Sequence, residues 1–122
     1  MIKRPLDIRF ADKVRDGIKT TTVRDKPWPV NTPIMLHHWS GKPYRSKHKD
    51  VAAIKVTGFW TICISKYRDG SMHYICGRKS DIPLYQAEGF ESQKEMDDWF
   101  NKLVQYGETI EKTLIAFHTI ES

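Results

Sequence analysis

The sequence of 122 residues has little of what holds a small secreted domain together or carries a chain across a membrane. It contains two cysteines, Cys63 and Cys76, which are too few for a disulfide framework. Its longest aliphatic run, Val51 to Ile54, is far shorter than the roughly 20 residues of a membrane span. Residues 1–7 lack the apolar core of a signal peptide. These absences predict a cytoplasmic protein with no membrane partner.

Internal repeats and low-complexity linkers are missing as well, so we expect one domain over residues 1–122. The charge within it is uneven. Residues 1–80 carry 17 basic and 6 acidic side chains, a balance of +11, whereas residues 81–122 carry 3 basic and 9 acidic ones, a balance of −6. A basic region of this strength attracts polyanions such as nucleic acid, nucleotides or phosphate groups. The alternative is a solvated surface that only aids solubility.

Hydrophobic spacing predicts an α+β domain in which strands dominate. A helical stripe that begins at Phe10 predicts a short helix over 10–16, and Ser92 with Glu95 forms a capping box for a second helix. The apolar stripe of that second helix is Met96, Trp99, Phe100 and Leu103. Strands are expected over 20–23, 34–39 and 113–120. The best matching architecture is a mixed, partly closed β-barrel with two to three short helices.

A long central strand is predicted after the polar segment 40–50. Its residues Ile54, Val56, Trp60, Ile62 and Ile64 are expected to share one face, with Gly58 marking a bulge or bend. Asp69-Gly70 indicates a two-residue hairpin turn, which would place Cys63 opposite Cys76. That pair could be a metal or redox site, or two buried thiols on neighbouring strands.

The densest cluster of polar side chains lies in residues 17–25. Thr20, Thr22 and Arg24 share one face of a strand because side chains alternate, and Lys19 can lean over that face from the preceding turn. A lysine, a hydroxyl and a guanidinium together can hold a carbonyl or phosphate oxygen. In a dry site, desolvation and the Arg24 charge would lower the Lys19 pKa, which would suit it to act as a base. An ordinary exposed strand is the alternative.

The motif Gly17-x-Lys19-x-x-Thr22-x-Arg24 resembles the signature of the ASCH domain family, and the resemblance spans nearly the whole chain. The later run Ala87-Glu88-Gly89-Phe90, followed by an amphipathic helix, is similar to the second half of that signature. Residues 33–36 resemble the strand that follows the family's proline/glycine turn, and residues 53–60 resemble its long central strand. The chain thus looks like a small, single-domain member of bacterial or phage type.

The resemblance implies a PUA-like fold and an association with RNA. It also implies two kinds of hydrolase, an N4-acetylcytidine amidohydrolase or a ribonuclease assisted by a divalent metal, although fold alone does not transfer activity. By motif, the amidohydrolase residues would be Lys19, Thr22 and Glu88, with Arg24 as a further charged group. Thr22 or a water would attack, Lys19 would accept the proton, Glu88 would deliver one, and Arg24 would steady charge. Alternatively, Glu88 only pairs with Lys19 or Arg24.

The polar segment 40–50 is longer than in the small amidohydrolases and suits an RNA backbone with a stacked base. Alternatively, it is a charge-rich loop without a ligand. Trp39 and Trp28 could line a base pocket or pack as core or rim residues. His37, His38, His48 and the cysteines lack the spacing of zinc ligands, so no metal is expected. The nucleic-acid contacts predicted beside Arg24 are Trp39, Lys42, Tyr44, Arg45, Lys47 and Lys49.

The sequence therefore predicts a domain that binds RNA or a modified nucleoside, with no cofactor. Hydrolysis of N4-acetylcytidine or of RNA is the alternative, and a divalent metal is expected only for the ribonuclease.

Overall fold

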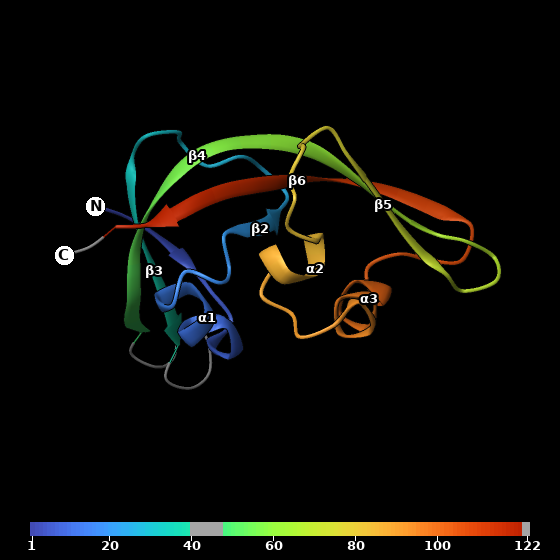
Figure 1. Ribbon diagram of the computed structural model, residues 1–122, viewed down its shortest axis with the longest axis horizontal. Coiled ribbons are helices and arrows are strands. Elements are labelled where there is room, and N and C mark those ends of the chain that lie inside the picture. Colours follow the sequence, from blue (N-terminus) through green and yellow to red (C-terminus); the bar gives the residue numbers. More distant parts are fainter. Residues whose placement is uncertain (40–47, 121–122) are drawn as a thin grey trace.

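A computed structural model describes residues 1–39 and 48–120, which form one mixed sheet with short helices against it (Figure 1). The elements in chain order are β1 (Ile2–Pro5), the 3-10 turn η1 (Ile8–Phe10), α1 (Ala11–Arg15), β2 (Thr21–Arg24), β3 (Pro33–Trp39), β4 (His48–Lys66), β5 (Met72–Cys76), α2 (Leu84–Ala87), α3 (Gln93–Asn101) and β6 (Glu108–Thr119). The predicted α+β class and the short helices are confirmed.

The long strands β4 and β6 pair over most of their length and arch across the molecule (Figure 1). The sheet order is β1-β3-β4-β6-β2, and β5 pairs with the second half of β4. Only the β1–β3 pair is parallel among the ladders of the described residues. None of the helices in this part of the chain is long and apolar enough to span a bilayer.

The prediction of a partly closed barrel is wrong, because the sheet does not close. Strands β1 and β2 stay at the two ends of the strand order, and no ladder joins them within the described ranges. The chain leaves β2 after Arg24 for a proline-rich segment that cannot continue a ladder. A side chain spans the gap instead: Arg24 Nη2 donates to the carbonyl oxygen of Pro5 at 2.7 Å.

A bulge in β4 divides the core between the two faces of the sheet. The pairing of β4 with β6 shifts between Val56 and Gly58, so Thr57 is an extra residue. One extra residue inverts the alternation of side chains, so the predicted irregularity at Gly58 is confirmed. The prediction of a single face is wrong: Ile54 and Val56 lie on one face, and Trp60, Ile62 and Ile64 on the other.

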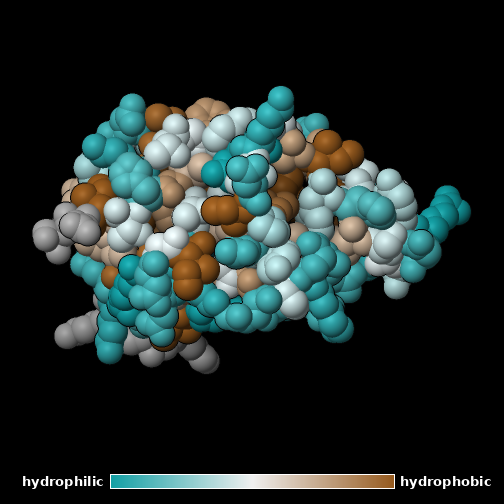
Figure 2. Space-filling view, in the orientation of Figure 1, coloured by the Kyte–Doolittle hydropathy of each residue, from teal (hydrophilic) through white to brown (hydrophobic). Residues whose placement is uncertain are grey.

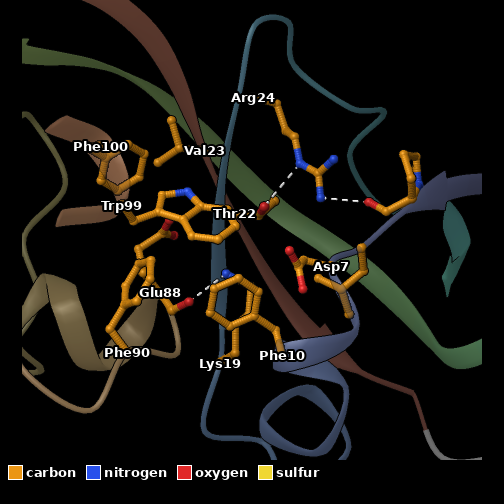
Figure 3. A pocket seen from close by; sticks show the side chains of 12 residues that line it. Asp7, Phe10, Lys19, Thr22, Val23, Arg24, Glu88, Phe90, Trp99 and Phe100 are labelled. Carbon is orange, nitrogen blue, oxygen red and sulfur yellow. Dashed lines mark hydrogen bonds between the residues drawn. The ribbon is translucent and has the colours of Figure 1, made fainter. Parts of the chain in front are cut away.

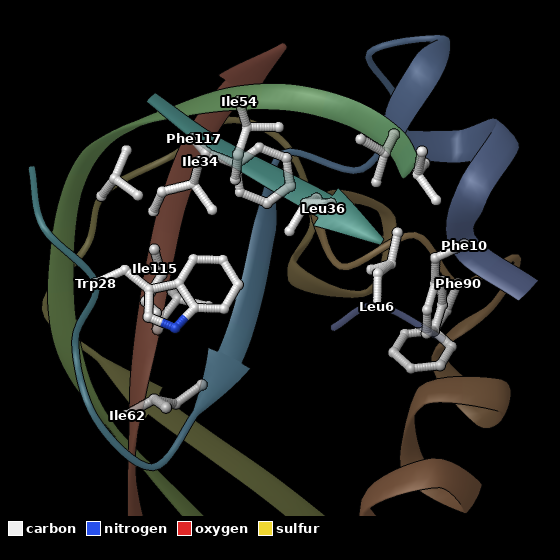
Figure 4. Packing of buried hydrophobic residues seen from close by; sticks show 14 of the residues in the cluster. Leu6, Phe10, Trp28, Ile34, Leu36, Ile54, Ile62, Phe90, Ile115 and Phe117 are labelled. Carbon is white, nitrogen blue, oxygen red and sulfur yellow. The ribbon is translucent and has the colours of Figure 1, made fainter. Parts of the chain in front are cut away.

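Each face is covered by a different part of the chain. On the face of Ile54, Trp28 is 6% exposed and packs among the aliphatic side chains of β3, β4 and β6 (Figure 4). On the other face, the ring of Tyr74 in β5 contacts Phe100 of α3, with 6.0 Å between centroids. Ser92 caps α3 by accepting the Glu95 N–H at 3.2 Å, which confirms the predicted helix start. The sheet thus has a core on both sides.

The β4–β5 hairpin has one more loop residue than predicted. The N–H of Tyr67 donates to the carbonyl of Ser71 at 2.9 Å, and Gly70 has a φ of 89°. This is the three-residue loop in which a glycine follows a type I turn. The extra residue shifts the register by one, so Cys63 and Cys76 do not face each other and lie on opposite faces of the sheet. The predicted cysteine pair is therefore wrong.

Deletion of Thr57 tests the role of the bulge. Without it, the side chains of the later part of β4 would face the wrong side of the sheet, so we expect loss of cooperative unfolding, measured by circular dichroism during thermal denaturation. Deletion of Lys79, which is exposed in the β5–α2 loop, should leave the transition cooperative. A cooperative transition of both variants near the wild-type midpoint would contradict this account.

Candidate functional site

A pocket of about 590 Å³ lies where the chain after β1, the edge strand β2 and the α2–α3 region meet (Figure 3). Figure 2 shows hydrophobic surface over the region of β2 and α1, framed by hydrophilic side chains. The pocket is lined by Pro5, Leu6, Asp7 and Phe10, by Lys19, Thr22, Val23 and Arg24, and by Glu88, Phe90, Trp99 and Phe100. The four residues predicted from the ASCH-like motifs are all among them.

Lys19 enters the pocket from a segment fixed at both ends. Its N–H donates to the Lys13 carbonyl at 3.0 Å, and the next residue, Thr20, donates to the Ala87 carbonyl at 2.8 Å. The side chain is only 3% exposed, and its Nζ donates to the backbone carbonyl of Glu88 at 2.6 Å. The same nitrogen lies 4.6 Å from the centroid of the Phe10 ring, a cation–π contact.

Burial is the largest influence on the Lys19 amine, and it lowers the pKa of that group. The negative charge of Glu88 opposes this change, and the positive charge of Arg24 adds to it. The pKa of Lys19 therefore lies below its ordinary value. A lysine of this kind reaches its neutral, proton-accepting form at a lower pH than an exposed lysine does.

Gly89 makes room for Lys19. It has a φ of 93°, in the left-handed region that favours glycine. A Cβ at this position would lie 3.1 Å from the Phe10 ring and 3.2 Å from two carbons of the Lys19 side chain. The bare backbone at Gly89 therefore allows the lysine to lie between Phe10 and the end of α2.

The Glu88 carboxylate contacts Thr21, the residue next to the predicted Thr22. Glu88 follows α2 and is 3% exposed, and its Oε2 accepts a hydrogen bond from the hydroxyl of Thr21. Sequence reasoning did not single out Thr21, because alternation places its side chain on the opposite face of β2 from Thr22. Glu88 lies so close to β2 in space that it reaches this second face.

Thr22 and Arg24 form the other polar part of the pocket. Arg24 Nε donates to Thr22 Oγ1 at 3.1 Å, which confirms that the two share a face (Figure 3). The guanidinium lies 4.8 Å from the centroid of the buried Trp28 ring. Trp28 is thus a core residue behind Arg24 and is not part of the pocket lining.

Aromatic side chains form the apolar wall. Phe10 contacts Phe90 and Trp99 edge-on, with centroid distances of 5.2 and 5.5 Å. Arg9 lies over this group, 5.1 Å from the Trp99 centroid, and pairs with Glu95 of α3. The sequence predicted Trp99 and Phe100 as core residues of an amphipathic helix. Their role as pocket lining follows only from the approach of α3 to Phe10.

Of the other predicted nucleic-acid contacts, Lys49 alone has a side chain that the structure describes. Lys42, Tyr44, Arg45 and Lys47 lie outside the described residues. Trp39 ends β3, but its side chain is also outside the description. Lys49 is exposed within β4 and pairs in register with His38, so residues 48–50 of the predicted loop 40–50 belong to a strand. Lys49 does not line the pocket.

The residues described by the structure include no group of three histidine, cysteine or acidic side chains that could hold a metal ion. Comparison of the chain with models of protein families, with curated proteins and with solved structures found no match. The relationship to ASCH domains remains a prediction from the sequence motifs.

Replacement of Lys19 by methionine tests the buried amine. Because burial lowers the folded-state pKa, the unfolded chain binds more protons than the folded chain between that pKa and about 10.4. The free energy of unfolding of the wild type, relative to Lys19→Met, should therefore rise with pH across this window. Urea denaturation at a series of pH values measures the difference.

The matched control is Lys79→Met, which removes an exposed lysine outside the pocket. Its difference from the wild type should vary less with pH than that of Lys19→Met. Equal pH dependence of the two variants would show that burial does not set the protonation of Lys19.

Proposed function

We propose that the chain binds a nucleobase in this pocket, within RNA or as a modified nucleoside, as a PUA-like, cytoplasmic member of the ASCH family. The observation that carries the proposal is the combination of four aromatic rings with a buried amine, a guanidinium and a carboxylate around one cavity. Aromatic faces stack on bases, and polar groups read their edges.

The size of the pocket agrees with this ligand class. Cavities of roughly 300–1,000 Å³ are usual for small-molecule sites, and the volume here is about 590 Å³. In Figure 3, Asp7 and Arg24 lie on one side of the pocket, whereas Phe90, Trp99 and Phe100 lie on the other side with Glu88 among them. A planar ligand with a polar edge therefore fits better than a purely apolar one.

The described cations give less support to an extended phosphate path. Arg9 pairs with Glu95, Lys13 with Glu91, and Lys112 with Asp25. These three cations are therefore engaged within the protein, and Lys42, Arg45 and Lys47 lie outside the described part of the chain. The base pocket is the better supported part of the proposal.

Binding can be measured by isothermal titration calorimetry with N4-acetylcytidine and with a short single-stranded RNA. We expect Trp99→Ala to weaken binding about tenfold, because stacking of a base on an aromatic ring contributes about 1–3 kcal/mol. Tyr67→Ala removes an aromatic ring that is 53% exposed and outside the pocket, and it should leave the affinity unchanged. Absence of binding for both ligands at low salt would contradict the proposal.

The buried amine favours a second candidate function, hydrolysis of an N-acyl group on the base. Water or the Thr22 hydroxyl would add to the acyl carbon, and Lys19 in its neutral form would take up the proton. The proton would then pass from Lys19 through the Glu88 carboxylate to the leaving amine as the carbon–nitrogen bond breaks. Attack by water gives the carboxylic acid and the free amino group directly, whereas an ester on Thr22 would need a water in a second step.

Chromatography after incubation with N4-acetylcytidine tests this candidate. The wild type should produce cytidine, Lys19→Met should lose at least about 100-fold in rate, and Lys79→Met should match the wild type. Equal traces for the wild type and Lys19→Met would exclude the mechanism. The ribonuclease alternative needs a divalent metal, and the described residues include no group of three histidine, cysteine or acidic side chains that could hold one.

A further inference from the structure

Asp7 is a pocket residue that the sequence motifs did not indicate. It lies between β1 and η1, and its Oδ1 accepts the N–H of Arg9 at 3.0 Å, which caps η1. The cap fixes the side chain, which is exposed and lines the pocket. Figure 3 shows its carboxylate directed toward the middle of the pocket, on the side that faces Lys19, Thr22 and Arg24.

The other charged groups of the pocket already have partners within the protein. Lys19 donates to the Glu88 carbonyl, the Glu88 carboxylate accepts from Thr21, and Arg24 donates to Thr22 and to Pro5. Asp7 differs from them. Across residues 1–39 and 48–120, it forms no ion pair, and its Oδ2 has no hydrogen-bond partner. The pocket thus offers an incoming ligand a fixed carboxylate oxygen.

A carboxylate oxygen accepts a hydrogen bond from an amino group and repels a carbonyl oxygen in the same place. A site that binds through such a hydrogen bond discriminates strongly against an analogue without the donor. An apolar pocket discriminates less between ligands that differ only in size. We propose that Asp7 is a specificity-determining residue, which selects bases that present an amino group over bases that present a carbonyl at that position. This inference rests on the proposed binding of a nucleobase.

Two pairs of nucleosides isolate this preference. Cytidine carries an amino group where uridine carries a carbonyl, and adenosine and inosine differ in the same way. Titration calorimetry with the wild type should show at least about tenfold tighter binding of the amino member in the pair whose ring fits the pocket.

Two variants remove the carboxylate but keep a residue that caps η1. Asn is as good a cap as Asp, and Ser is close to both, so Asp7→Asn and Asp7→Ser should fold as the wild type does, checked by circular dichroism. In both, the ratio of affinities should fall to about twofold or less. Asp16→Asn is the matched control, because Asp16 is exposed and outside the pocket lining. It should keep the wild-type ratio.

The outcomes separate this inference from the proposed function. A wild type that binds both members of each pair equally, or a ratio that Asp7→Asn and Asp7→Ser leave unchanged, overturns the role of Asp7 and leaves base binding intact. Binding of RNA or N4-acetylcytidine but of none of the four nucleosides also overturns it. Absence of binding for all six ligands overturns the proposed function together with the inference.

Discussion

The burial of the Lys19 amine is the constraint on which the pocket depends. Removing an ammonium group from water is costly unless other groups replace the lost hydration. Here the Glu88 carbonyl accepts its hydrogen bond at 2.6 Å, and the Phe10 ring lies 4.6 Å away. These contacts hold the end of α2 against η1 and against the segment before β2, and they require the bare backbone of Gly89. The same burial lowers the pKa of the amine.

Some of the opposite charges in the two halves of the chain pair with each other within the molecule. Two cations of the basic half, Arg9 and Lys13, pair with Glu95 and Glu91 of the acidic half. Exposed ion pairs of this kind contribute little stability, so the packing of Arg9 over the aromatic rings matters more for holding α3 at the pocket. The acidic half therefore supplies one wall of the pocket as well as Glu88.

Local features of the fold were predictable because they depend on neighbours in sequence. The short helix at Phe10, the start of α3 at Ser92 and the irregularity at Gly58 are confirmed. The errors arose where a single extra residue reverses which face of the sheet the following side chains occupy. The extra Thr57 and the extra loop residue at Gly70 each move the side chains that follow in the strand to the opposite face of the sheet. The alternation of residues in the sequence continues unchanged through both positions.

The sequence by itself determined the short elements and placed Lys19, Thr22, Arg24 and Glu88 in two motifs. Only the tertiary structure decided how the two motifs meet, because Lys19 and Glu88 are 69 positions apart in the chain. It left the sheet open at β2, joined Glu88 to Thr21, and brought Asp7 and the α3 rings to the same cavity. Such contacts depend on sheet curvature and on the closing of long loops, and no local pattern of residues encodes them.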